Sequence, residues 1–224
     1  MKTFKEYRAQ GLAALKGNWP QVLIATILIT IVAIIIYLPY FGAIFSVEDS
    51  MAYEDPTGYL GIVLWPFLLY LAGAVLFIYP LSVGYASAFR KLHVDNDDNV
   101  AANTFKDTFK PWGRNVWGMF LMYLFIGLWS LLLYIPGIIK TFSYIMTPYI
   151  LKDYPELSAN QAINLSRKMM KGHKFDFFCL MLSFIGWIIL CCFTFGIGLI
   201  WLMPYMSSTM TAYYLDLKAE YESK

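Results

Sequence analysis

Long uncharged stretches, separated by segments that hold nearly all the cations, constrain this chain more than any other feature. The 224 residues contain uncharged runs at positions 17–47, 56–89, 115–139, 141–151 and 177–215. A helix needs roughly 20 predominantly apolar residues to cross the hydrocarbon core of a bilayer. The pattern therefore predicts a polytopic helical membrane protein.

The last uncharged run and the stretch 115–151, which is interrupted only by Lys140, are each longer than one span needs, so each is expected to contain a turn. Pro136 and Gly137 provide it in one stretch, and Gly196 and Gly198 provide it in the last, because proline and glycine both weaken a helix. We therefore predict an all-α fold in which six transmembrane helices form three hairpins. The predicted spans are about 20–45, 59–89, 115–135, 137–151, 175–194 and 198–217.

The cations of the chain fall on one side of such a layout. All but one of the 17 Lys and Arg residues lie in the N-terminal segment, the second connection, the fourth connection or the tail. Lys140, the exception, is placed at an outer turn, and residues 48–55 form an acidic outer loop. Cytoplasmic loops carry an excess of Lys and Arg, so both termini are expected to be cytoplasmic. The first apolar run is too long for a cleavable signal peptide.

Two segments of the chain resemble one another closely enough to indicate an internal repeat. Residues 121–127 and 180–186 share the pattern Leu-Met-x-x-Phe-Ile-Gly, and Pro80, Pro148 and Pro204 each follow or precede a tyrosine in a returning helix. The alternative is chance similarity between apolar sequences. We predict one membrane domain, 1–224, built from three repeats at about 1–92, 93–152 and 153–220.

Each predicted hairpin is preceded by a short amphipathic segment. The apolar stripes consist of Phe4, Tyr7, Gly11, Leu12 and Leu15 in the first segment, Ala101, Phe105, Phe109 and Trp112 in the second, and Ala159, Ala162, Ile163, Ser166 and Met170 in the third. In the third segment, Ser158 and Gln161 also form a capping box. Helices of this kind lie in the membrane interface with the apolar face towards lipid.

Cations flank all three stripes and predict a basic cytoplasmic collar that recognises anionic lipid headgroups. The candidate headgroup residues are Lys16, Trp19, Lys110, Arg114, Arg167, Lys168, Lys171, His173 and Lys174. The alternative is that these segments are ordinary connections, whose cations only set the orientation of the protein.

Ionisable side chains are missing from the core of every predicted span, which argues against a proton-coupled pump. The last predicted helix instead carries many hydroxyl groups: Tyr205, Ser207, Ser208, Thr209, Thr211, Tyr213 and Tyr214. Such a helix is expected to face other helices or a polar cleft rather than lipid.

No residue pattern indicates catalysis, a metal or a cofactor. His93 and His173 are too far apart for a zinc motif, and residues 95–106 lack the glycine and glutamate of a calcium loop. The cysteines, Cys179, Cys191 and Cys192, fall in one predicted span and are expected to act as small apolar residues. We expect a protein that is not an enzyme, has no cofactor and does not bind nucleic acid.

Several motifs resemble a bacterial family catalogued as domain of unknown function 975. They are residues 135–140, 144–149, 153–159, 162–163, 166–174, 182–187, 196–198 with 204–205, and the opening Lys16-Gly17-Asn18-Trp19. The layout is also similar to the membrane domain of some bacterial glycerophosphodiester phosphodiesterases. The resemblance implies a six-span protein of the bacterial inner membrane, and it implies no agreed activity and no list of functional residues.

The repeat, the broken helices, the basic segments and the hydroxyl-rich last helix favour one function. We expect non-enzymatic binding or movement of a lipid or other amphiphile between the hairpins. The alternative is a scaffold or accessory subunit that organises a partner membrane protein. The expected partners are therefore membrane lipids, another membrane protein or a second copy of this chain.

Overall fold

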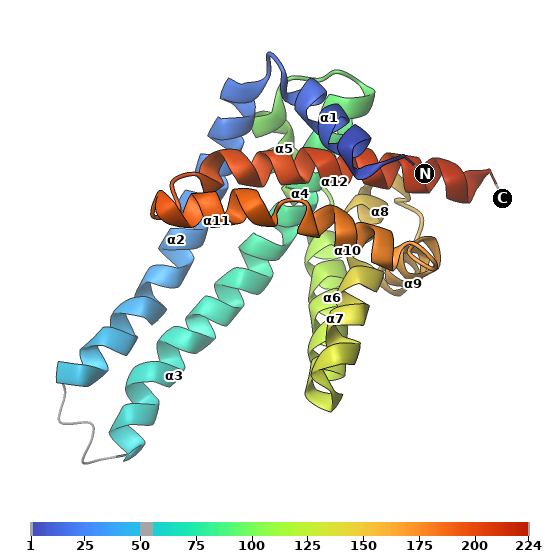
Figure 1. Ribbon diagram of the computed structural model, residues 1–224. Helices are drawn as coiled ribbons and strands as arrows, with labels where there is room; N and C mark the ends of the chain where they lie inside the picture. Colours follow the sequence, from blue (N-terminus) through green and yellow to red (C-terminus); the bar gives the residue numbers. More distant parts are fainter. Residues whose placement is uncertain (1, 50–55, 224) are drawn as a thin grey trace.

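The computed structural model describes residues 2–49 and 56–223, and all the secondary structure in these ranges is helical. Helix α2 (Trp19–Asp49) and the stack of α3 (Pro56–Gly73), η2 (Ala74–Ile78) and α4 (Tyr79–Val94) form a long hairpin (Figure 1). The Tyr40 and Tyr70 rings stack across it, 5.8 Å apart. Residues 50–55 of the predicted acidic loop lie outside the described residues.

A second hairpin pairs α6 (Trp112–Leu132) with α7 (Tyr134–Tyr144). The chain reverses at Leu133, whose backbone is extended, just before the predicted Pro136-Gly137 turn. Gly137 lies so close to Ser130 that a side chain there would clash. The predicted fourth span, 137–151, is wrong as a single helix. The chain breaks after α7, and α8 (Thr147–Asp153) begins with Pro148 in its first turn, where proline is tolerated.

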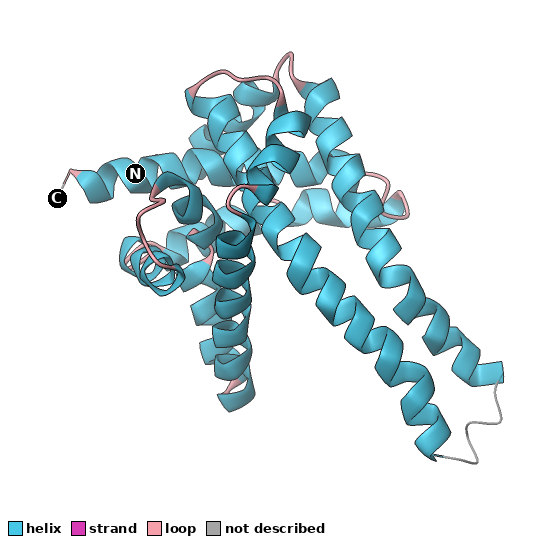
Figure 2. Ribbon diagram, turned by 180° about the vertical axis from the view of Figure 1, so that it is seen from behind, coloured by secondary structure: helices cyan, strands magenta, loops and turns pink. Residues whose placement is uncertain are grey.

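The last three helices are α10 (Lys174–Leu182), α11 (Ile185–Phe193) and α12 (Leu199–Glu222). The turn between α11 and α12 falls at the predicted glycines: Phe195 and Gly196 have φ values of 51° and 84°, and Gly198 caps α12. These helices run across the long axes of the two hairpins instead of beside them (Figures 1 and 2). The predicted third transmembrane hairpin is therefore not confirmed: α10 and α11 turn back into α12, but these helices lie across the other two hairpins.

Helix α12 lies in the middle of the molecule and contacts α1, α2, α4, α9 and α11. Its hydroxyl-bearing residues Ser208, Thr209 and Thr211 are fully buried, which confirms that this helix faces other helices. Pro204 lies inside α12 without ending it, and Pro80 lies in the first turn of α4 directly after the π-helical turn η2. Neither proline is a helix break.

Four helical stretches of the described residues are long and apolar enough to cross a membrane: Trp19–Ser46, Gly61–Val94, Trp112–Leu132 and Lys174–Phe193. They support a membrane protein, but the six-span arrangement is not confirmed. With 11 residues, α7 is too short for a full crossing. The hydroxyls and terminal charges of α12 make it less apolar than a lipid-facing helix.

Three short helices, α1 (Phe4–Leu15), α5 (Val100–Phe109) and α9 (Ala159–Met169), each precede an apolar helix. The triplication of the sequence stays a prediction. The capping box of Ser158 and Gln161 at the start of α9 is confirmed.

The apolar stripes of α9 and α1 pack mainly against protein rather than lipid. All five stripe residues predicted for the third segment are buried. In α1, Tyr7, Gly11 and Leu15 are buried against α12, while Phe4 and Leu12 stay exposed. Ser208 of α12 donates a hydrogen bond to the Gly11 carbonyl at 2.8 Å. The prediction that these stripes face lipid is therefore wrong for α9 and for most of α1.

Helix α5 buries a neighbouring face in place of the predicted stripe. Thr104 and Thr108 are fully buried, whereas Phe109 and Trp112 are exposed. Gly84 of α4 causes the difference, because the absence of a side chain lets the α5 backbone approach to within contact of α4. Phe109 and Trp112 are left on the outside and Ala101 and Phe105 are half-buried, so the interfacial position of this stripe stays a prediction.

Candidate functional site

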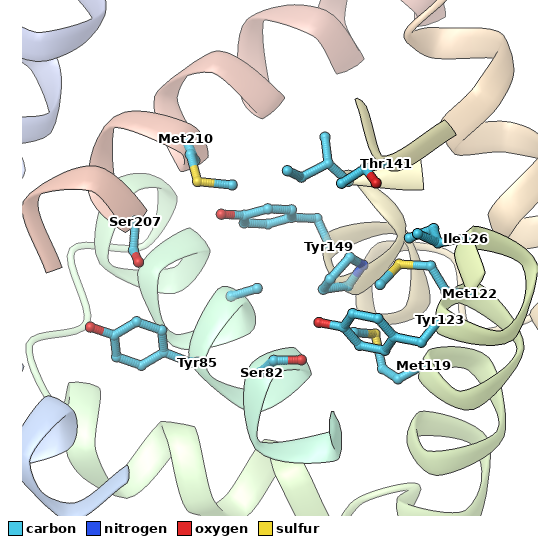
Figure 3. Close-up of a pocket in the computed structure, with 13 residues that line it drawn as sticks. Ser82, Tyr85, Met119, Met122, Tyr123, Ile126, Thr141, Tyr149, Ser207 and Met210 are labelled. Carbon is cyan, nitrogen blue, oxygen red and sulfur yellow. The ribbon is translucent and has the colours of Figure 1, made fainter. Parts of the chain in front are cut away.

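A cavity of about 250 Å³ lies where α4, α6, α7, α8 and α12 meet, and we call it the central cavity (Figure 3). The residues that line it come from both hairpins and from the transverse helix α12. They combine hydroxyl groups with thioethers and include no charged side chain: Ser82, Tyr85, Ala86, Met119, Met122, Tyr123, Ile126, Thr141, Ile145, Pro148, Tyr149, Ser207 and Met210. Mostly apolar walls with a few polar groups are typical of small-molecule sites.

Helical spacing brings these groups to one place. Ser82 and Tyr85 are one turn apart on α4, and Ser207 and Met210 are one turn apart on α12. In Figure 3 the hydroxyls of Ser82 and Tyr123 lie near one another, with Tyr85 and Ser207 on the other side of the cavity. Hydroxyl pairs of this kind can bind an ester, hydroxyl or phosphate oxygen through hydrogen bonds.

Fixed contacts hold the walls of the central cavity. Tyr85 hydrogen-bonds Thr26 of α2 at 2.8 Å. Tyr149 lies 3.2 Å from the Thr211 hydroxyl and stacks on Tyr214 with ring centroids 4.7 Å apart. Burial raises the pKa of Tyr149 to about 12, so its hydroxyl stays neutral and can donate a hydrogen bond.

The central cavity has two neighbours that share its lining residues. A cavity of about 340 Å³ between α2, α4 and α12 shares Ser82, Tyr85, Ser207 and Met210 with it. On the other side, Tyr123 also lines an apolar groove of about 500 Å³ between the two hairpins. We call this groove the inter-hairpin groove. The three spaces therefore lie next to one another, from the groove between the hairpins to the side of α2.

A buried ion-pair network joins helices that also line the central cavity, and the sequence patterns did not predict it. Asp153, at the end of α8, has a side chain only 2% exposed. It pairs with Arg90 of α4 and with Lys218 of α12, the latter at 2.7 Å, and it accepts a hydrogen bond from Tyr214 at 2.9 Å. The network joins three helices that supply cavity walls. Its only sequence signal was a single carboxylate directly after an apolar helix.

The predicted headgroup residues do not form one site. Lys16, Lys110, Arg167, Lys168 and Lys171 are exposed at the surface, and Trp19 is half-buried at the start of α2. Three candidates remain: Arg114, His173 and Lys174. Arg114 and His173 have partners within the protein, whereas Lys174 forms no ion pair with the described residues.

Arg114 has a structural role in place of the predicted one. Its guanidinium donates hydrogen bonds to the carbonyls of Leu151, Tyr154 and Leu157 at 2.6 to 3.2 Å, and so caps the C-terminus of α8. His173 lies 3.3 Å from the Glu220 carboxylate.

Lys140 lies in a basic cluster with Arg167 and Lys174, and not at the predicted outer turn. Burial, followed by the charges of Arg167 and Lys174, lowers the pKa of the Lys140 ammonium. The ammonium lies 4.3 Å from the Trp129 ring centroid. None of the three cations forms an ion pair with an acid in the described part of the chain. The cluster was missed because its members come from three different helices.

Comparison with known families gives one match. Residues 119–221 match the model of a family described as a protein of unknown function, DUF975. This part of the chain holds α7 to α11, most of α6 and nearly all of α12, so it is similar to an uncharacterised family over the second hairpin and the transverse helices. No curated protein and no solved structure matches the chain. The similarity to the membrane domain of glycerophosphodiester phosphodiesterases stays a prediction.

Proposed function

We propose that this protein binds a membrane amphiphile in the central cavity, without catalysing a reaction. The observation that carries the proposal is the position of the cavity, at the junction of both hairpins and α12, with a lining of hydroxyls and thioethers. An apolar chain can reach it from the bilayer along the inter-hairpin groove, which shares Tyr123 with it. Exchange with the bilayer would use the same route.

The basic cluster supports an anionic headgroup for this amphiphile. Lys140, Arg167 and Lys174 present three cations, none of which forms an ion pair with an acid among the described residues. Thr141, the residue after Lys140, lines the central cavity. A lipid bound at this place would put its head beside the cluster and its chain in the cavity.

We also propose a multi-pass position in a bacterial inner membrane, with both termini in the cytoplasm. The ion pair between Lys2 and Asp216, 2.9 Å long, joins the N-terminal segment to the C-terminal part of α12, so both ends lie on one side. The cations at that side support the orientation through the excess of Lys and Arg in cytoplasmic segments.

A cavity-filling variant tests the binding site. Ala86 is buried at the cavity wall, and Ala86→Phe places a ring in the space that the amphiphile would occupy. The matched control is Ala102→Phe, on the exposed side of α5. Native mass spectrometry of protein released from lipid nanodiscs, with identification of the retained lipid, is the measurement.

The unaltered chain and the control are expected to retain one chemically selective amphiphile, and Ala86→Phe is expected to lose it. Retention by Ala86→Phe contradicts binding in the central cavity. A chain that carries only bulk lipid in all three forms contradicts the proposed function and favours the alternative, organisation of a partner membrane protein.

A further inference from the structure

The Arg8 side chain of α1 contacts the turn that separates α10 from α11. The chain turns between α10 and α11 at Ser183 and Phe184, and this turn frees backbone carbonyls. The Arg8 guanidinium donates one hydrogen bond to the Ser183 carbonyl at 3.3 Å and another to the Tyr205 hydroxyl at 3.2 Å. It also lies 5.2 Å from the Phe184 ring centroid. These contacts fix the position of the guanidinium.

The same guanidinium lines a second cavity of about 420 Å³, which we call the Arg8 pocket. Its walls are almost entirely apolar and include Trp19, Trp187, Trp201 and Leu190. It shares no lining residue with the central cavity. A single charged group at the edge of an apolar pocket matches a ligand with a charged head and an apolar chain.

The free donors in the Arg8 pocket limit the size of that head. The Thr194 hydroxyl donates to the Cys191 carbonyl at 2.9 Å and accepts from the Gly198 amide at 3.0 Å, so it is occupied. The Nη2 group of Arg8 forms no hydrogen bond or ion pair with the described residues. The Tyr205 hydroxyl accepts from Arg8 and keeps its own proton to donate.

We propose that the Arg8 pocket binds a long-chain fatty acid, with the carboxylate on Arg8 and Tyr205 and the acyl chain against the tryptophans. The free Nη2 group of Arg8 and the hydroxyl proton of Tyr205 together offer a donor for each oxygen of a carboxylate, and the charge of the guanidinium strengthens the first of these hydrogen bonds. A larger glycerol-phosphate head would leave polar atoms without partners in these walls. The pocket volume also suits one chain rather than two. This site is independent of the proposed function, because the two cavities share no residue.

The tryptophans allow the occupant to be detected directly. A background in which Trp65, Trp112, Trp117 and Trp129 are replaced by Phe keeps only the three tryptophans of the Arg8 pocket. Bromine on a bound acyl chain quenches their fluorescence. None of the 13 residues that line the central cavity is a tryptophan, so binding there does not contribute. Dibromostearate is titrated into the protein in nanodiscs of unbrominated phosphatidylcholine.

We expect saturable quenching by dibromostearate at a low mole fraction. Arg8→Gln is expected to raise the half-saturating concentration on the order of tenfold or more, because it removes charge-assisted hydrogen bonds. Lys5→Gln is the matched control, since Lys5 is exposed on the same helix and loses the same charge. It is expected to leave the titration unchanged.

A second comparison does not depend on whether the Arg8 variant folds. In the background chain with Arg8 intact, the methyl ester of dibromostearate has the same acyl chain without the anion, and it is expected to bind on the order of tenfold more weakly. Equal quenching by the acid and the ester overturns the proposal, and so does equal quenching by a dibrominated phosphatidylglycerol. Quenching that rises linearly without saturation also overturns it.

Discussion

Asp153 gives the sharpest prediction about what holds this fold together. Its side chain is 2% exposed and is the common partner of Arg90 and Lys218, whose side chains are 27% and 21% exposed. Asp153→Asn keeps the shape and removes the charge, so both cations lose their buried partner. Removing one member of a buried ion pair typically costs about 3–5 kcal/mol.

The structure places the expected cost at the lower end of that range or just below it. Both cations keep some access to water, and both have a second acid at 3.9 Å, Asp95 for Arg90 and Glu222 for Lys218. We therefore expect Asp153→Asn to lower the free energy of unfolding by about 2–3 kcal/mol. Because the amide that replaces the carboxylate would still accept a hydrogen bond from Tyr214, most of the loss is electrostatic.

Reversible unfolding in detergent, followed by far-ultraviolet circular dichroism, measures this loss. Glu156→Gln is the control, since Glu156 is exposed in the same connection and forms no ion pair within the described residues. A second variant, Asp153→Asn with Lys218→Met, is expected to recover part of the stability because it removes one uncompensated charge. An unfolding free energy within about 0.5 kcal/mol of the unaltered protein refutes the buried network.

Three further predictions test other parts of the account. Gly84→Ala is expected to lower the free energy of unfolding by about 1–3 kcal/mol through a clash with α5, whereas Gly113→Ala, with open space around it, is expected to be nearly silent. Arg114→Gln is expected to lower the free energy of unfolding without changing the lipid that the protein retains, whereas the control Lys171→Gln is expected to leave the stability unchanged. An Arg114→Gln variant that loses the retained lipid but keeps its free energy of unfolding contradicts the capping role. Burial alone would raise the pKa of the Asp216 carboxyl, but hydrogen bonds from Lys2 and Tyr7 outweigh it and hold this pKa below its usual range. The stability it contributes is therefore present above the usual carboxyl pKa and is lost as the pH falls through the lowered value, so Asp216→Asn is expected to flatten the acid limb of a Tm-against-pH profile.

Much of the fold could be predicted from local patterns in the sequence. The apolar helices, the turn at Gly196 and Gly198, and the capping box at Ser158 all depend on residues within a few positions of one another. The burial of the hydroxyl-rich α12 also followed from composition, because hydroxyls in a membrane helix seek partners on other helices.

The arrangement of those helices could not be predicted, because it depends on contacts between distant segments. Gly84 lets the Thr104 and Thr108 side of α5 pack closely against α4, and this contact cannot be predicted from the apolar stripe of α5 alone. Asp153 and Arg8 each have partners far along the chain, so neither belongs to a local motif. The transverse position of α10 to α12 goes with the burial of the middle of α12, from Leu202 to Leu217, against α1, α2, α4 and α9, and a count of apolar residues does not predict these contacts.

Binding of an amphiphile in the central cavity is the main functional claim, and site-specific photocrosslinking in the membrane tests it most directly. A diazirine amino acid replaces Met210, which lines the cavity, and in a control it replaces Leu131, which is 86% exposed beside the inter-hairpin groove. Mass spectrometry identifies the adducts. Binding in the central cavity predicts one selective amphiphile at position 210 and bulk lipids at position 131. The same bulk lipids at both positions, or no lipid adduct at position 210, would contradict it.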